Sequence, residues 1–167
     1  MNIKLIIQFL LSFLRTIYLF EAKKNIRHIS YNNLKLKKFT NIKSIKELWL
    51  KSYLKKNNKD SRFNQKQILL VLYYKDEIVC LGWMYIGSKW LITEIGKEII
   101  KKNSIILFDF FTRPKFRNKG FYRKILNLIR NFNSNKKFII YSLKSNKQSV
   151  KAILKAKFKL VDQLRRW

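Results

Sequence analysis

The sequence contains very few of the residues on which several classes of protein depend. Its 167 residues include one cysteine (Cys80), one histidine (His28), one proline and four glycines. A single Cys and a single His exclude disulfide scaffolds, zinc ribbons and fingers, Cys-His dyads and Ser-His-Asp triads. The scarcity of Gly and Pro excludes collagenous, linker-like and low-complexity chains. Acids are scarce too, because nine Asp and Glu stand against 38 Lys and Arg, for a formal charge of +29.

The residues that are abundant suffice for one packed domain. Apolar residues make up 47% and aromatics 15%, which excludes disorder. Lys, Asn and Ile together make up a large share of the chain, and we hypothesise that A/T-rich coding places Lys and Asn wherever any polar residue serves. Only clustered charge then carries information about partners. A normal Lys content in other proteins of the same organism would contradict this view.

The segment 1–20 is almost wholly apolar. Polar residues at 4, 8, 12, 15 and 16 form one narrow stripe on a helix. Arg15 argues against a spanning helix, and no signal-peptide cleavage pattern is clear. We expect a helix that lies in a membrane interface or packs on its own domain or on a dimer partner. We favour peripheral membrane contact through residues 1–28, where Lys23 to His28 form a cationic patch.

Two units follow from this interpretation, an N-terminal helix with its basic patch (residues 1–28) and a second unit over residues 29–167. The location expected is cytoplasmic, peripheral on the inner face of the membrane.

Strands are predicted at 32–40, 68–74, 78–86, 105–111, 138–143 and 157–164, and helices at 44–56, 120–132 and 145–155. Lys75-Asp76-Glu77 predicts a hairpin turn, Ser44 a helix cap, and Ser145 or Asn146 another cap. The fold class is α/β with mixed strand pairing.

The segment 105–125, IILFDFFTRPKFRNKGFYRKI, carries the strongest functional signal. A buried strand runs into a basic loop and then into a helix that begins at Gly120. The free amides and the dipole of a helix N-terminus favour an anion near residues 118–122. Phosphate oxygens would find side-chain donors in Arg113, Arg117, Lys119 and Arg123. The alternative is an ordinary strand-helix junction in a Lys-rich chain, but the concentration of cations around one glycine favours a site.

Residues 117–122, Arg-Asn-Lys-Gly-Phe-Tyr, resemble the Arg/Gln-x-x-Gly-x-Gly/Ala loop of the GCN5-related N-acetyltransferase (GNAT) family, which binds the pyrophosphate of acyl-CoA. The preceding FDFFTRPKFR resembles that family's fourth strand. Asn146, Ser149, Ile153 and Phe158 resemble its Asn-x-x-Ala helix and the following Gly-Phe. The order of elements also agrees from about residue 32 to the end. Around Asp109 and residues 120–122 the sequence is most similar to members from cell-surface polysaccharide gene clusters.

The resemblance implies a GNAT-like sheet, mixed and mostly antiparallel, flanked by helices. It also implies an N-acyltransferase that moves an acetyl group from acetyl-CoA to an amine, such as an amino sugar, by direct attack and without a metal. The cofactor-binding residues implied are Phe110, Phe111, Thr112, Arg117, Asn118, Lys119, Gly120, Phe121, Tyr122, Arg123 and Asn146.

Two acids are candidates for the general base. Asp109 is the first, because burial in an apolar strand should raise its pKa; the alternative is a structural carboxylate neutralised by a nearby cation. Glu94 is the second, and a solvated surface acid is the alternative for it. Tyr141 and Tyr85 are further sources of a hydroxyl, although strand tyrosines more often serve packing.

The sequence departs from the family pattern at several positions. Tyr122 occupies the final small position of the loop, and Lys157 replaces the glycine before Phe158. Ile153 stands where many members have the tyrosine that reprotonates the leaving thiolate, and Trp167 leaves little room for a closing hairpin. A catalytically degenerate CoA-binding or membrane-associated protein is therefore one alternative. A nonspecific nucleic-acid-binding protein is another, although no zinc site, helix-turn-helix spacing or Arg-rich arm predicts a specific nucleic-acid partner.

Overall fold

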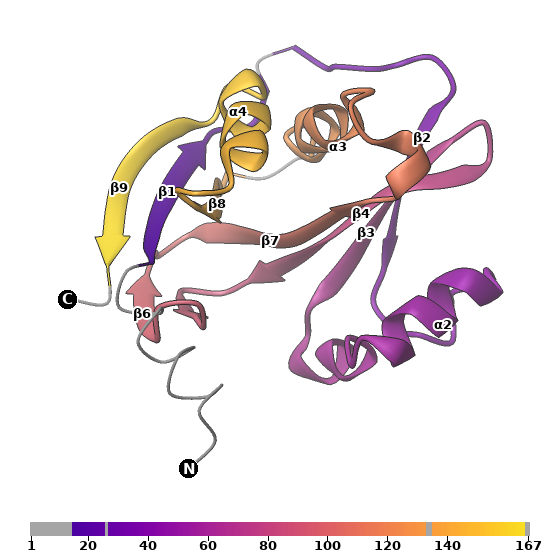
Figure 1. Cartoon of the computed structure of the whole chain (residues 1–167), viewed down its shortest axis with the longest axis horizontal. Coiled ribbons are helices and arrows are strands. Elements are labelled where there is room, and N and C mark those ends of the chain that lie inside the picture. Colours follow the sequence, from indigo (N-terminus) through magenta and orange to yellow (C-terminus); the bar gives the residue numbers. More distant parts are fainter. Residues whose placement is uncertain (1–14, 26, 133–134, 166–167) are drawn as a thin grey trace.

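The computed structural model describes residues 15–25, 27–132 and 135–165 (Figure 1). The strands are β1 (Thr16–Ala22), β2 (Leu34–Phe39), β3 (Ile68–Tyr74), β4 (Glu77–Ile86), β5 (Lys89–Ile92), β6 (Lys97–Ile100), β7 (Ser104–Thr112), β8 (Lys137–Leu143) and β9 (Lys159–Arg165). The α-helices are α2 (Leu48–Lys56), α3 (Phe121–Ile129) and α4 (Lys147–Lys155). Two short 3₁₀ helices are η1 (Asp60–Gln65) and η2 (Pro114–Phe116).

Seven strands form one sheet in the order β2-β3-β4-β7-β8-β1-β9, and β5 and β6 form a separate hairpin. Only β7 and β8 are parallel; the other neighbours in the sheet are antiparallel. Helices α3 and α4 cover one face, while α2 and the β5–β6 hairpin cover the other (Figure 1). The predicted fold class, a mixed and mostly antiparallel sheet flanked by helices, is confirmed.

β1 occupies a position for which the sequence predicted a helix. It pairs antiparallel with β8 on one side and with β9 on the other. Both faces of β1 are covered, since Leu19 lies in the α2-side core and Phe20 in the α3-side core, each with no exposed surface. A strand buried on both faces has a continuous apolar sequence, which periodicity cannot distinguish from a buried helix.

The predicted helix is therefore wrong over residues 16–20, and residues 1–14 lie outside the described residues. Residues 16–22 belong to the same sheet as the strands that follow residue 29, so β1 is not part of a separate N-terminal unit. β9 pairs with β1 rather than with a strand that follows it. Within the described part of the chain, β1 thus provides the pairing partner for β9 that a closing hairpin would otherwise provide.

Most other predicted elements are confirmed with small shifts. The hairpin of β3 and β4 turns at Lys75 and Asp76, both with positive φ, as its tight turn requires. Helix α2 begins at Leu48 rather than at Ser44, whose hydroxyl donates instead to the Asn41 carbonyl at 2.8 Å. Asn146 caps α4 as predicted, but Leu154, for which the helical spacing predicts an inward position, is 47% exposed. The β5–β6 hairpin was not predicted.

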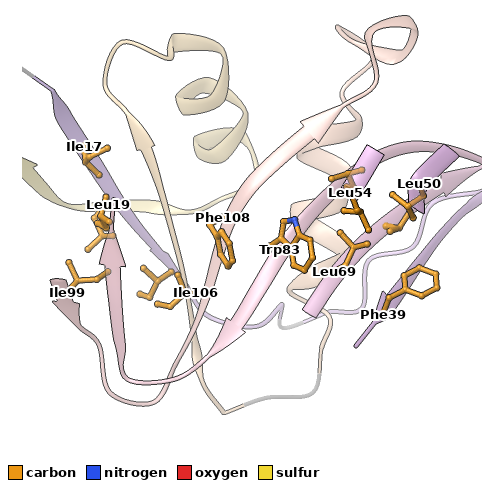
Figure 2. Close-up of a cluster of buried hydrophobic side chains, with 14 of the residues drawn as sticks. Ile17, Leu19, Phe39, Leu50, Leu54, Leu69, Trp83, Ile99, Ile106 and Phe108 are labelled. Carbon is orange, nitrogen blue, oxygen red and sulfur yellow. The ribbon is translucent and has the colours of Figure 1, made fainter. Parts of the chain in front are cut away.

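The α2-side core extends across the whole sheet. Figure 2 shows it as a row of buried side chains that runs from Ile17 and Leu19, through Phe108 and Trp83, to Phe39. Because this core crosses the strands without a break, it holds β1 and β2 in one rigid sheet on which loops can be positioned. Within the described ranges, no helix has the length and apolar character needed to cross a membrane.

Candidate functional site

β7 and β8 are paired over only part of their length. Their parallel ladder runs from Ser104 opposite Lys137 to Leu107 opposite Ile140. β7 continues to residue 112 and β8 to residue 143 without further pairing between them. Successive main-chain groups of a strand alternate between its two edges, so part of the backbone of residues 108–112 faces no neighbouring strand. We refer to this opening of the ladder as the split.

A β-bulge marks the point where the split begins. Asp109 and Phe110 together stand opposite a single residue of β4, Gly82, and Asp109 has φ +49°. The extra residue directs Asp109 towards the α2 side and Phe110 towards the α3 side. The Phe110 ring lies so close over Gly82 that a Cβ atom there would be 2.3 Å from it. The bulge therefore depends on a glycine at position 82.

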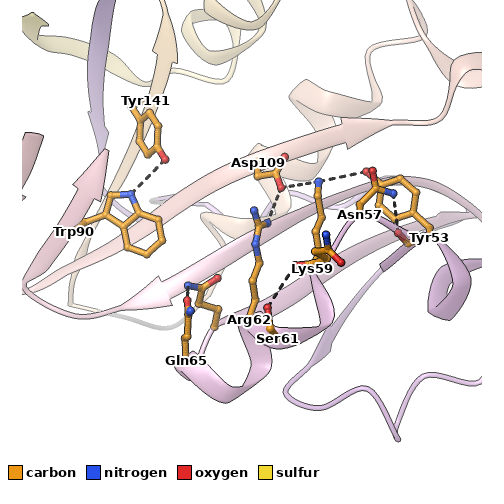
Figure 3. Close-up of polar contacts among 11 residues, drawn as sticks. Tyr53, Asn57, Lys59, Ser61, Arg62, Gln65, Trp90, Asp109 and Tyr141 are labelled. Atoms are coloured by element: carbon orange, nitrogen blue, oxygen red, sulfur yellow. Dashed lines mark hydrogen bonds and ion pairs between the residues drawn. The ribbon is translucent and has the colours of Figure 1, made fainter. Parts of the chain in front are cut away.

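Asp109 forms two ion pairs with residues of the loop after α2. Its Oδ2 lies 2.7 Å from Lys59 Nζ and 2.5 Å from Arg62 Nη1, and its side chain is 33% exposed (Figure 3). Partial burial raises the pKa of Asp109, but the hydrogen bonds and charges of Lys59 and Arg62 outweigh it and hold that pKa below its ordinary value. The predicted raised pKa is therefore wrong. The two cations make Asp109 a poor proton acceptor near neutral pH.

Tyr141 of β8 lies on the other side of the split. Its hydroxyl accepts a hydrogen bond from Trp90 Nε1 at 3.3 Å (Figure 3). Burial raises the pKa of Tyr141, and the negative charges of Glu94 and Asp109 raise it further. The phenol is therefore protonated at neutral pH and can donate a proton or a hydrogen bond.

Glu94 is close enough to Tyr141 for its charge to act on the phenol. Its carboxylate accepts a hydrogen bond from the Thr93 hydroxyl at 3.4 Å, and no Lys or Arg of the described chain forms an ion pair with it. Glu94 is partly exposed. Of the two predicted bases, Glu94 is thus the one that forms no ion pair with a Lys or Arg of the described residues, whereas Asp109 forms two.

The start of α3 presents an open row of main-chain amides. Asn118 and Gly120 have φ of +61° and +74°, and nothing lies within 4 Å of a Cβ added at Gly120. The amides of residues 118–120 have no acceptor among the described residues. The first amides of α3 have no partner within the helix, and no side chain caps them. In this exposed, uncapped arrangement the amides can donate hydrogen bonds to an anionic group such as a phosphate.

Three of the four predicted cations border these amides. Arg117, Lys119 and Arg123 are exposed, and Arg117 Nε donates to the Thr112 carbonyl at 3.3 Å. Arg113 is the exception, and its predicted place is wrong. Its Nη1 donates to a β4 carbonyl, that of Ile78, at 3.1 Å, and its guanidinium packs on the Trp49 ring.

The remaining predicted residues divide between the two faces of the split. On the α3 side, the Tyr122 ring packs at a tilt against the Phe110 ring with centroids 5.2 Å apart, and its hydroxyl shares a hydrogen bond with Ser149 at 3.2 Å. The large side chain at the last loop position therefore ties α3 to α4. On the α2 side, Phe111 stacks on Tyr53 at 5.1 Å.

Other predicted residues have internal structural contacts. The Thr112 hydroxyl donates to Cys80 Sγ at 3.4 Å, and Phe121 is buried in the α3-side core. The Asn146 side chain accepts from the Ser149 amide at 3.1 Å. Ile153 is fully buried. The sequence did not identify Lys59, Arg62 or Trp90 as site residues, because they reach the split from segments distant in the sequence.

No known protein-family profile and no curated protein matches this chain. Solved structures do resemble it. A conserved protein of unknown function from Staphylococcus epidermidis ATCC 12228 gives a TM-score of 0.58 at 10% identity, over 89% of this chain and 59% of that one. A protein of Novosphingobium aromaticivorans DSM 12444 assigned to the GNAT family of acetyltransferases gives 0.56 at 10% identity, over 89% and 61%.

An acetyltransferase of the GNAT family from Colwellia psychrerythraea gives a TM-score of 0.50 at 14% identity, over 89% of this chain and 53% of that one. The chain thus spans between 53% and 61% of the length of these proteins. At this identity the likeness concerns the fold alone. The chain has a GNAT-like fold.

Proposed function

We propose that the protein is an N-acyltransferase that uses acetyl-CoA, or another acyl-CoA, to acylate an amine. The observation that carries the proposal is the split between β7 and β8 beside an uncapped α3 N-terminus. The split provides unpaired main-chain groups beside a bulge, and the start of α3 provides amides and cations that can bind a diphosphate. The same arrangement also fits a protein that binds acyl-CoA without transferring the acyl group, so the test must separate the two.

We refer to the main-chain amides of residues 118–123, together with Arg117, Lys119 and Arg123, as the α3 cradle. The α3 cradle would hold the acyl donor, acyl-CoA. Main-chain amides of residues 118–123 would bind the pyrophosphate, with Arg117, Lys119 and Arg123 adding charge-assisted hydrogen bonds. The thioester supplies the activated acyl group. The Arg113 amide donates to the Val79 carbonyl of β4, so by alternation the Phe111 amide also faces β4. Of the two strand amides considered for polarising the thioester carbonyl, that of Phe110, beside the bulge, is therefore the candidate.

Glu94 and Tyr141 would move the protons. Glu94 accepts a proton from the acceptor amine as the amine nitrogen bonds to the acyl carbon. The carbon–sulfur bond breaks, and the Tyr141 hydroxyl donates its proton to the departing thiolate. Tyr141 would then fill the role for which Ile153 is unsuited. Asp109 would act as a positioning residue that fixes Lys59 and Arg62 beside the split.

The α2 side of the split favours a neutral or anionic acceptor over a polyamine. Arg113, Trp49, Tyr53 and Phe111 form a continuous stack there, and Lys59 lies 3.4 Å from the Tyr53 hydroxyl. Cations along an aromatic surface repel a ligand with several ammonium groups. An amino sugar, with apolar ring faces and one amine, is the first acceptor to test.

The proposal is tested by measuring thiol release from acetyl-CoA with a panel of amines that includes amino sugars, amino-sugar phosphates and a polyamine. Glu94→Gln should lower kcat at least ~100-fold, because it removes the proton acceptor. It should leave the Kd for CoA unchanged, because Glu94 lies away from the α3 cradle. Glu98→Gln is the matched control, since Glu98 is an exposed acid of the same hairpin.

Different failures identify different errors. CoA binding without thiol release from any amine would contradict transfer and favour the binding protein. Full activity of Glu94→Gln would contradict the base assignment alone. Loss of activity in Glu98→Gln as well would show that the hairpin tolerates no change of charge, and the assignment of Glu94 as the base would then be unsupported.

A further inference from the structure

A second basic region lies at the opposite end of β7 from the split. A surface hollow of about 520 Å³ opens where β1 ends and where β7 and β8 begin. β7 has nine residues, so at about 3.3 Å per residue its two ends lie about 26 Å apart. Neither the α3 cradle nor the acceptor side of the split contributes a residue to this hollow. The proposed acyl transfer does not use it.

Three loops distant in the sequence each bring a Lys-Lys pair next to an asparagine to this hollow. Residues 23–25 and 101–103 read Lys-Lys-Asn, and residues 135–137 read Asn-Lys-Lys. The second and third loops are joined at the backbone, because the Lys137 amide donates to the Asn103 carbonyl at 3.1 Å. The sheet therefore holds the three motifs together, although they lie far apart along the chain. We refer to this region as the lysine hollow.

The lysine content of the hollow exceeds what the composition of the chain explains. Six of its ten lining residues are lysines, whereas lysines make up 29 of 167 residues overall. The chain contains five Lys-Lys pairs, at 23–24, 37–38, 55–56, 101–102 and 136–137, and three of them line the hollow. Coding bias raises the number of lysines everywhere, but it does not gather pairs from three loops into one place.

Positive charges outnumber negative ones among the described residues that line the hollow. Glu21 is the one acid among them, and it bridges Lys101 and Lys137 at 3.3 Å each. The lining thus carries a net charge of +5. Like charges held this close repel one another. A ligand with several negative charges would relieve this repulsion.

We propose that the lysine hollow binds a compact ligand that carries two or more phosphate groups. Its volume is that of a small-molecule site. Lysine ammonium groups and asparagine amides are donors suited to phosphate oxygens. Among the described lining residues Ile100 is the one apolar side chain and none is aromatic, so they offer no ring on which a nucleotide base would stack. The phosphates belong either to a soluble polyphosphate compound or to the headgroup of a polyphosphorylated lipid.

Isothermal titration of the full chain with tripolyphosphate, in buffer of fixed ionic strength, tests the proposal. Lys101→Gln/Lys102→Gln should weaken binding at least about tenfold. Lys55→Gln/Lys56→Gln should leave it within twofold. This control removes the same charge from the same Lys-Lys-Asn sequence, at exposed positions at the end of α2 that do not line the hollow.

A second variant guards against misfolding, because Lys101 pairs with Glu21. Lys23→Gln/Lys24→Gln changes another loop and should weaken binding by a similar factor; Lys23 supports the fold through its carbonyl, which accepts from Arg130. Equal loss of binding in the Lys55/Lys56 variant would overturn the proposal, since it would mean a nonspecific response to net charge. Binding that CoA displaces would overturn it too, because the anion would then occupy the α3 cradle.

Experiments with vesicles distinguish a soluble polyphosphate compound from a lipid headgroup as the source of the phosphates. Phosphatidylcholine vesicles that also contain cardiolipin present a headgroup with two phosphates, and tripolyphosphate should displace the protein from them if the headgroup enters the hollow. Vesicles of phosphatidylcholine alone are the control. Binding to the cardiolipin vesicles that tripolyphosphate reverses identifies a lipid source. Binding to tripolyphosphate without binding to the vesicles identifies a soluble source. Absence of binding to both tripolyphosphate and the cardiolipin vesicles would contradict the proposal.

Discussion

The two ends of β7 are both basic, but they differ in how the positive charge is presented. At the C-terminal end the ladder to β8 opens, a bulge displaces Asp109, and unpaired main-chain amides lead into α3. At the N-terminal end the ladder is complete and the charge lies on lysine side chains alone. Fixed amides can orient one ligand precisely enough for chemistry, whereas flexible lysines provide attraction without defined geometry. Net charge by itself would not have distinguished the two regions.

The largest expected difference between the two ends of β7 is in how much a truncated side chain lowers the free energy of unfolding. Phe138 lies at the closed end with no exposed surface, and Phe111 lies half-buried at the split. Phe138→Ala should lower the free energy of unfolding by ~3–5 kcal/mol, because a cavity remains in a packed core. Phe111→Ala should cost about 1–2 kcal/mol, because less apolar surface is lost. Urea unfolding measures both, and equal costs would show that the split is as closely packed as the core.

The closed end could be predicted from the sequence only in part. The apolar runs at 105–111 and 138–143 predicted the paired strands correctly, because strands buried on both faces are apolar throughout. The same property hid β1, since residues 16–20 suit a buried helix equally well. The β5–β6 hairpin was missed because its strands have four residues each, too few for a clear periodic signal.

The open end was predicted in outline and not in detail. Gly120 and its basic surroundings correctly predicted the start of α3 and the exposed cations beside it, because helix starts, glycines and cations are local features of sequence. The environment of Asp109 is not local, since Arg62 reaches it across 47 positions and a bulge turns it towards that partner. No pattern in residues 105–111 predicts either the bulge or the partner. The pKa of Asp109 was therefore predicted in the wrong direction.

Variants at the two ends of β7 should each weaken the binding of a different ligand by about tenfold. Arg117→Gln/Lys119→Gln should weaken CoA binding about tenfold, because it removes charge-assisted hydrogen bonds at the cradle. It should leave tripolyphosphate binding at the lysine hollow unchanged, whereas Lys101→Gln/Lys102→Gln should do the reverse. Titration calorimetry with both ligands on both variants measures the separation. If either variant weakened both ligands equally, the two ends would not be independent sites.

The smallest expected effect concerns the ion pairs of Asp109. Asp109→Asn should lower the free energy of unfolding at pH 7 by about 1 kcal/mol, because partly exposed pairs contribute little and Lys59 and Arg62 would lose their acceptor. The folded pKa of Asp109 lies below its unfolded value, so its contribution is present above pH ~4 and is lost as the pH falls through the folded pKa.

Chemical unfolding at pH 7 and near pH 3 checks the sign of this prediction. The gap between the wild-type protein and Asp109→Asn should narrow at the lower pH, because the Asp109 carboxylate of the unfolded chain, whose pKa is the higher of the two, becomes protonated there. A gap that widens on acidification would mean that Asp109 has a raised pKa. The interpretation of Asp109 as a carboxylate held by Lys59 and Arg62 would then be wrong.

Amide NMR spectra recorded during a titration with acetyl-CoA test the central claim most directly. If the open end of β7 is the donor site, the largest shift changes should fall on residues 108–112 and 118–123. Residues 101–103 and 135–137, at the closed end, should change little. Changes centred on the lysine hollow, or no change at millimolar acetyl-CoA, would contradict the claim that the split and the α3 cradle form an acyl-CoA site.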